Sequence, residues 1–145
     1  MELEIITHPL EINIHGFGGF AVNKDYVGTA FKLSGKMWET VKREAIKNKG
    51  KNIWVYEGNE KVFAGVALED PLTKDTELEH KIIVLEKYAY YKHIGPYGLI
   101  KEKGQMMTKE LNSKGFDTTL PYIEIYGHWN SDEEKCETEL FMSLK

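Results

Sequence analysis

Alternating apolar and polar residues run through the last third of the chain. In residues 122–126, Ile123 and Ile125 fall on one side, while Tyr122, Glu124 and Tyr126 fall on the other. A period of two residues is typical of a β-strand whose apolar side faces a core. Patterns of this kind predict further strands over residues 10–23, 53–56, 62–68, 82–95 and 139–144.

Apolar residues at helical spacing predict two helices, over residues 36–49 and residues 97–114. Ser34 is a suitable N-cap for the first helix, because its hydroxyl can accept a hydrogen bond from the first turn. Gly50 and Gly115 follow the expected ends, where glycine readily takes the backbone conformation that stops a helix.

The expected elements follow the order strand–helix–strand–strand twice, which divides the chain into pseudo-repeats of about 1–72 and 73–145. This order predicts an α+β fold in a single domain, an antiparallel sheet with two helices on one face and a central ligand cleft. We expect Ile123 and Ile125 to lie under the helices. Trp54, Tyr56 and Glu124 would then face a cleft on the opposite side of the sheet.

Length and composition narrow the class of protein. The 145 residues fit one domain, and 41% hydrophobic with 29% charged residues is ordinary for a globular protein. No apolar run is long enough to span a membrane, and the acidic start is unlike a signal peptide. A single cysteine excludes an internal disulfide framework. These features favour a cytoplasmic protein.

Charge and motifs exclude several partners. A net charge of −4 argues against nucleic acid as a partner, and the five histidines show no metal-ligand spacing. Only about ten residues precede the first expected strand, so we expect no helix-turn-helix and no direct DNA binding. We also expect no metal, no cofactor and no membrane association.

Glu124 is the main candidate for chemistry because it stands between two tyrosines. A lone glutamate on a strand is most often a solvated surface residue. In a concave aromatic wall, however, the carboxylate would be partly desolvated, which raises its pKa unless a cation compensates. Aromatic faces add cation–π attraction of about 0.5–2 kcal/mol each. This combination predicts a site for bulky, apolar, positively charged molecules.

Three segments in the second half resemble the GyrI-like family of effector-binding domains. They are YKHIGPY (91–97), PYIEIYG (121–127) and TELFMSLK (138–145), and the resemblance is clearest over residues 82–145. The family includes domains at the C-terminus of drug-sensing transcription regulators. The resemblance implies tandem strand–helix–strand–strand modules around a cleft, with the glutamate of the I-E-x-Y pattern, here Glu124, projecting into it.

The resemblance implies a small-molecule-binding protein, with a lipophilic, drug-like and cationic ligand. A tryptophan in the first helix is common in the family and matches Trp38. The loop with His128 and Trp129 departs from the family pattern, so neither residue receives a role. The expected ligand-binding residues are Glu124, Tyr122, Tyr126, Trp38, Trp54, Tyr56, Tyr90 and Tyr97.

Two alternatives share the same fold. Some family members hydrolyse cyclopropane-containing genotoxins, and in such an enzyme Glu124 would be the general base and catalytic residue. Another group protects DNA gyrase and would use the outer surface of the domain. We favour a stand-alone binding module, because the sequence offers no unambiguous second catalytic group beside Glu124.

Overall fold

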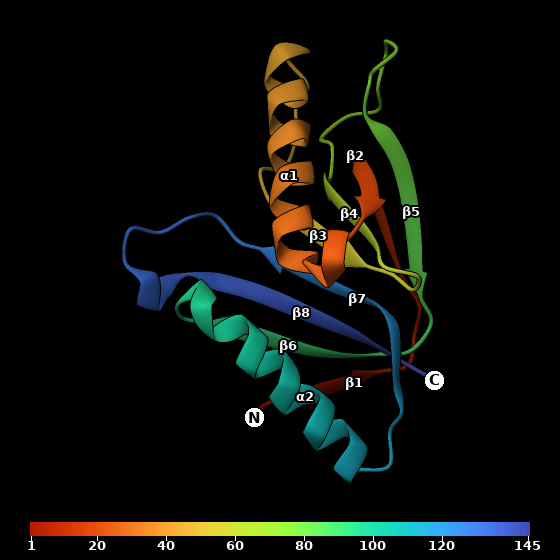
Figure 1. Cartoon of the computed structure of the whole chain (residues 1–145), viewed down its shortest axis with the longest axis vertical. Coiled ribbons are helices and arrows are strands. Elements are labelled where there is room, and N and C mark those ends of the chain that lie inside the picture. Colours follow the sequence, from red (N-terminus) through yellow and green to blue (C-terminus); the bar gives the residue numbers. More distant parts are fainter.

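The computed structural model describes residues 1–145 and confirms the predicted α+β fold, with one eight-stranded sheet and two α-helices (Figure 1). All strand pairs are antiparallel, and the strand order is β1-β6-β8-β7-β3-β4-β2-β5. The elements are β1 (Glu4–Ile6), β2 (Leu10–Phe20), α1 (Tyr26–Arg43), β3 (Asn52–Tyr56), β4 (Lys61–Val66), β5 (Glu79–Leu85), β6 (Tyr88–Ile94), α2 (Ile100–Ser113), β7 (Thr118–Tyr126) and β8 (Glu137–Leu144). Neither helix is long and apolar enough to span a membrane.

The segment predicted as one strand over residues 82–95 is two strands, β5 and β6. Only Glu86 and Lys87 separate them, although β5 is one edge of the sheet order and β6 is next to the other edge. The sheet must therefore curl until its two ends meet. The sequence pattern did not reveal the turn at Glu86 and Lys87, because the residues on either side of it, Leu85 and Tyr88, are both buried in the same core.

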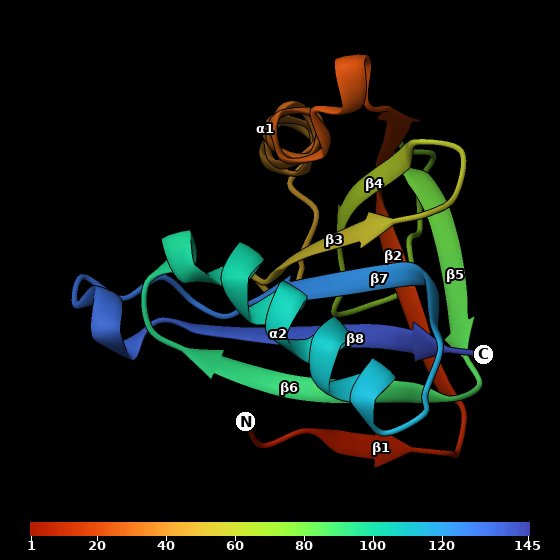
Figure 2. The ribbon, with the colours of Figure 1, turned by 60° about the horizontal axis from the view of Figure 1, so that its bottom comes forward.

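The main hydrophobic core fills the inside of the curled sheet. Strands from both ends of the sheet order supply it, and they cross one another in Figure 2. Its buried members are Ile12, Ile14, Ile53, Val55, Phe63, Ile83, Leu85, Tyr88, Ile123 and Phe141. Burial of these side chains is the principal force that holds the two ends of the sheet together.

Both helices pack on the opposite, outer face of the sheet. Met37 and Val41 of α1 join a cluster with residues of β2 and β4, while Met107 and Leu111 of α2 join one with β6 and β8. The expectation that Ile123 and Ile125 lie under the helices is therefore wrong. The apolar side of β7 is required inside the curled sheet, so Glu124 lies on the face that carries the helices.

The first helix begins and ends earlier than predicted. α1 spans Tyr26–Arg43, and the Asp25 side chain caps it by accepting a hydrogen bond from the Gly28 main-chain nitrogen at 3.0 Å. Ser34, the expected N-cap, lies buried in the middle of the helix. Ser34 lies on the side of α1 that faces the sheet, where the other buried residues are mostly apolar. Because Ser34 is polar, the helical pattern of apolar residues appeared to begin after it.

The second helix agrees with its prediction. A 3₁₀ turn over Tyr97–Leu99 leads into α2, and the helix ends at Ser113. Gly115 follows with a φ of +84°, the left-handed conformation expected of a glycine that stops a helix.

Replacement of Gly16 by alanine should test the tight pairing of β2 with β4. A Cβ at Gly16 would overlap the main-chain carbonyl oxygen of Ala64 on the neighbouring strand. We expect Gly16→Ala to lower the free energy of unfolding by about 3 kcal/mol, at the upper end of overpacking costs. Chemical denaturation measures this change.

Gly35→Ala is the matched control, because Gly35 lies in α1 with open space around the added methyl group. This substitution should raise the free energy of unfolding by about 0.5–1 kcal/mol, through the better helix propensity of alanine. Equal changes in the free energy of unfolding at Gly16 and Gly35 would contradict the observed pairing of β2 with β4, which places Gly16 against the backbone of Ala64.

Candidate functional site: a cavity between the helices

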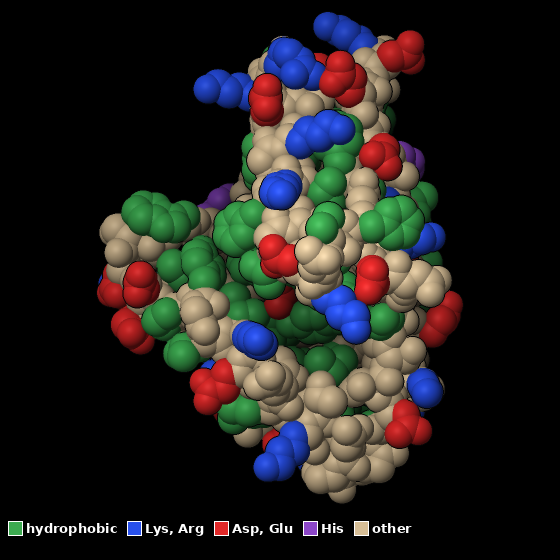
Figure 3. All heavy atoms as spheres, viewed as in Figure 1, with side chains coloured by type: hydrophobic (Ala, Val, Ile, Leu, Met, Phe, Trp, Pro, Cys, Tyr) green, Lys and Arg blue, Asp and Glu red, His purple; other side chains and the backbone are tan.

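A cavity of about 1120 Å³ opens on the helix-bearing face (Figure 3). It lies between α1 and α2, above β3 and β7, because the two helices leave the middle of the sheet uncovered. The volume is slightly above the usual range of about 300–1,000 Å³ for small-molecule pockets. Its lining includes Tyr26, Val27 and Phe31 of α1, Asn52, Trp54 and Tyr56 of β3, Lys101 and Gly104 of α2, Tyr122, Glu124 and Tyr126 of β7, and Met142 of β8.

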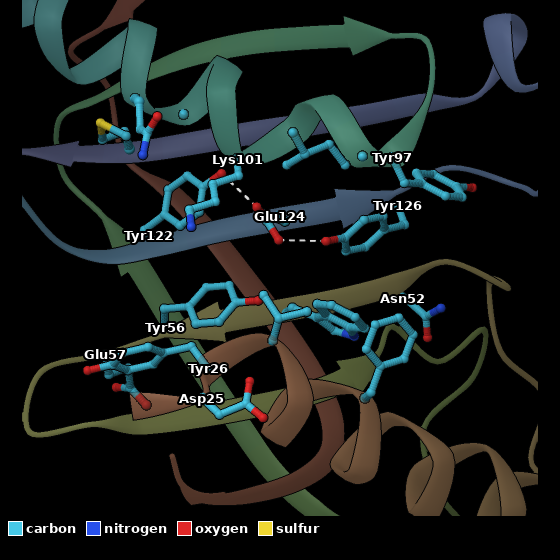
Figure 4. A pocket seen from close by; sticks show the side chains of 18 of the residues that line it. Asp25, Tyr26, Asn52, Tyr56, Glu57, Tyr97, Lys101, Tyr122, Glu124 and Tyr126 are labelled. Carbon is cyan, nitrogen blue, oxygen red and sulfur yellow. Dashed lines mark hydrogen bonds between the residues drawn. The ribbon is translucent and has the colours of Figure 1, made fainter. Parts of the chain in front are cut away.

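Glu124 lies at the floor of this cavity with only 7% of its surface exposed. Its Oε1 accepts a hydrogen bond from the Tyr126 hydroxyl at 2.6 Å, and its Oε2 accepts one from the Tyr122 hydroxyl at 2.8 Å (Figure 4). The two tyrosines are the residues at i−2 and i+2 on the same strand. They share a face with Glu124 because side chains alternate along a strand.

Burial raises the pKa of Glu124 above its ordinary value, and the hydrogen bonds from Tyr126 and Tyr122, together with the nearby Tyr56 hydroxyl, oppose that rise. Burial and the nearby carboxylate together raise the pKa of each of these three hydroxyls. No ion pair includes Glu124. The site therefore holds a carboxylate with hydrogen-bond donors and without a cationic partner.

Aromatic rings form the wall around Glu124. Tyr56 and Tyr122 stack across β3 and β7 with ring centroids 5.9 Å apart, and Trp54 meets Tyr126 edge-on at 4.8 Å. Phe31 of α1 contacts Trp54 edge-on at 5.1 Å. These contacts link the floor of the cavity to α1 and present both ring faces and ring edges to its interior.

The structure brings together six of the eight residues expected at the site. Glu124, Tyr122, Tyr126, Trp54, Tyr56 and Tyr97 all line the cavity. The aromatic residues of both halves of the chain thus meet, as expected. They meet on the helix-bearing face, because the opposite face of β3 and β7 is occupied by the core.

Trp38 and Tyr90 lie outside the cavity lining. Tyr90 packs beside the core of the curled sheet and donates a hydrogen bond to Glu139 at 2.7 Å. Trp38 packs beside the cluster under α1, and its indole Nε1 donates to Asn52 Oδ1. Both side chains therefore have partners away from the cavity, although Asn52 is itself a lining residue.

Several lining residues were missed in the sequence. Tyr26 and Phe31 belong to the part of α1 that the late predicted start excluded, although Asp25 is a good N-cap signal just before them. Trp129, whose role the sequence left open, lines the cavity with 76% of its surface exposed. Nothing in the sequence indicated Lys101. No group of three or more His, Cys, Asp or Glu side chains is placed to hold a metal ion.

The raised pKa of Glu124 should make stability depend on pH. The folded state holds this proton more tightly than the unfolded state does, so stability falls as pH rises from about 4 through the folded-state pKa. We expect Glu124→Gln to remove that fall. The thermal midpoint of the variant, relative to the wild type, should increase between pH 4 and pH 8. Parallel pH profiles for the two proteins would show that Glu124 titrates normally.

Comparisons with known proteins support the fold. No family model and no curated protein matches the sequence. The C-terminal domain of EcmrR has a TM-score of 0.73 at 16% sequence identity, over 99% of this chain and 96% of that one. EcmrR in a complex with DNA has a TM-score of 0.67 at 13% identity. That match covers 99% of this protein but only 56% of the EcmrR chain.

Other solved structures share the same arrangement. SAV2435 bound to tetraphenylphosphonium has a TM-score of 0.65 at 17% identity, over 100% of this chain and 94% of that one. A hydrolase from Listeria innocua has a TM-score of 0.56 at 14% identity, over 99% and 92% of the two chains. At such identities the similarity establishes the fold alone. This chain has the GyrI-like fold that its sequence motifs predicted.

Proposed function

We propose that this protein binds small, lipophilic, cationic molecules in the cavity between α1 and α2. The observation that carries the proposal is the buried carboxylate of Glu124, which has two tyrosine donors and no lysine, arginine or histidine nitrogen within 4 Å. A positively charged ligand would supply the missing charge. It would also favour the ionised form of Glu124 and so oppose the effect of burial on its pKa.

The surrounding rings favour a cation that is large and apolar. Tyr56, Tyr122 and Trp54 line the cavity close to Glu124, and aromatic faces attract cations by about 0.5–2 kcal/mol each, depending on desolvation. An apolar ligand also gains by leaving water, at about 25 cal/mol per Å² of buried apolar surface. SAV2435, which shares the fold, has been solved with the lipophilic cation tetraphenylphosphonium, and this supports the proposed ligand class.

Charge selectivity tests this proposal. Wild-type protein should bind tetraphenylphosphonium more tightly than uncharged triphenylphosphine oxide. Glu124→Gln keeps the side-chain volume and removes the charge, so it should weaken phosphonium binding by about 1–3 kcal/mol, the scale of a hydrogen-bonded charged contact. Isothermal titration calorimetry measures both affinities.

Glu139→Gln is the matched control. Glu139 is also a β-strand glutamate that accepts a tyrosine hydrogen bond, from Tyr90 at 2.7 Å, but it does not line the cavity. Its substitution should leave phosphonium affinity unchanged. Equal affinity of the wild type for the cation and the neutral compound would refute the role proposed for Glu124.

Hydrolysis of strained electrophiles, such as cyclopropane-type genotoxins, is a second candidate function. A hydrolase needs a base and a second group that fixes or activates the electrophile. The hydroxyls of Tyr122 and Tyr126 converge on Glu124, so the cavity contains candidates for that second group. Both hydroxyls donate to the carboxylate, however, and such hydrogen bonds stabilise its ionised form and so weaken it as a base.

Incubation with a cyclopropane-bearing DNA alkylator separates the two functions. We expect binding without ring opening by water, because the hydrogen bonds from Tyr122 and Tyr126 weaken the carboxylate as a base. Liquid chromatography with mass spectrometry follows the hydrated product. More than one turnover per protein molecule, lost in Glu124→Gln, would establish the hydrolase instead.

A further inference from the structure

Asn52 is a polar residue at one end of the cavity, on the same face of β3 as Trp54 and Tyr56. It pairs with Tyr126 across β3 and β7, while Trp54 pairs with Glu124. Asn52 is thus two residues along the strands and one strand across from Glu124. These spacings place the Cα atoms of Asn52 and Glu124 about 8 Å apart.

Two donors of α1 hold the side-chain amide of Asn52 in one orientation. The Ser34 hydroxyl donates to Oδ1 at 3.1 Å, and the Trp38 indole Nε1 donates to the same atom. Only the carbonyl oxygen of an amide can accept two such bonds, so the NH₂ group must be on the other side. The Nδ2 atom has no acceptor in the protein and is not buried, and Asn52 lines the cavity (Figure 4).

The neighbouring residue Trp54 adds a second donor without a partner. Trp54 lines the cavity with 5% of its surface exposed, and its indole Nε1 is buried without an acceptor. Most buried polar groups are hydrogen-bonded, so an unpaired donor calls for an explanation. Phe31, which contacts the Trp54 ring edge-on, is itself 64% exposed, so only an exposed side chain covers Trp54 on that side.

We propose that this end of the cavity recognises an uncharged hydrogen-bond acceptor, such as a carbonyl or ether oxygen, on the same ligand whose cation binds Glu124. Asn52 is the specificity-determining residue, and Trp38 and Ser34 are positioning residues that aim its NH₂ group. The inference rests on the proposed binding of cations. It narrows the ligand class to cations that also carry an uncharged hydrogen-bond acceptor.

The charged side chains of the cavity lining, three carboxylates against two lysines, argue for an uncharged acceptor. Asn52 Oδ1 is already occupied by its two donors, so the Asn52 side chain offers a ligand its NH₂ donor and no free acceptor. A carboxylate or phosphate on the ligand would also meet the unpaired negative charge of Glu124 on the next strand. A neutral oxygen satisfies the donors without that repulsion.

Two phosphonium ions of matched shape test the inference. The probes are (4-acetylbenzyl)triphenylphosphonium and (4-isopropylbenzyl)triphenylphosphonium, which carry the same charge and differ in a carbonyl oxygen against a methyl group. Their affinity ratio, acetyl over isopropyl, is measured by calorimetry for each protein. The ratio is insensitive to partial misfolding, because a smaller active fraction affects both probes equally.

Asn52→Leu removes the donor and should lower this ratio by about two- to tenfold, the worth of one neutral hydrogen bond. Trp38→Phe keeps an aromatic ring but frees the amide, so it should lower the ratio in the same direction. Ser34→Ala should have a smaller effect. Ser113→Ala, at the far end of α2, is the matched control and should leave the ratio unchanged.

The outcomes separate this inference from the function on which it rests. If both probes bind and the ratio is the same in wild type, Asn52→Leu and Trp38→Phe, the acceptor subsite is refuted while cation binding stands. If wild-type protein binds neither probe, the proposed function fails and the subsite fails with it. A ratio that falls in both variants supports the subsite.

Discussion

The closure of the curled sheet is the constraint on which the rest of the structure depends. Only Glu86 and Lys87 join β5 to β6, which lie near opposite ends of the strand order, so the sheet can form only if these ends meet. Closure turns one side of every central strand into the core. The helices and the cavity are then left to share the other side, and the alternation along β7 places Glu124 there.

The tyrosines make a buried carboxylate tolerable at this position. An isolated charge in an apolar cavity is costly, and hydrogen bonds to the ionised form reduce the cost. Tyr122 and Tyr126 provide those bonds from the same strand, so the arrangement requires no distant residue. It also leaves the carboxylate without a counter-charge. We regard this incomplete compensation as the physical basis of the proposed preference for cations.

Helix α1 connects the cavity to the rest of the domain in two ways. Its first turns supply Tyr26 and Phe31 to the cavity lining. Further along the helix, Ser34 and Trp38 donate hydrogen bonds to the side-chain oxygen of Asn52. Trp38 thus reaches the cavity only through another residue. The sequence thus pointed to Trp38 as a residue near the site, but the expectation that Trp38 itself contacts the ligand is not met, because Asn52 lies between them.

The sequence by itself determined the existence of two helices, the central strands and the presence of Glu124 between Tyr122 and Tyr126. These features depend on local periodicity and on neighbouring positions of one strand, which a linear pattern contains. Only the tertiary structure decided which face carries the cavity, that Trp38 and Tyr90 lie outside it, and that Phe31 and Asn52 line it. The physical reason is that packing between strands far apart in the chain decides which face of the sheet becomes the core, and the local sequence pattern of one strand contains no information on that packing.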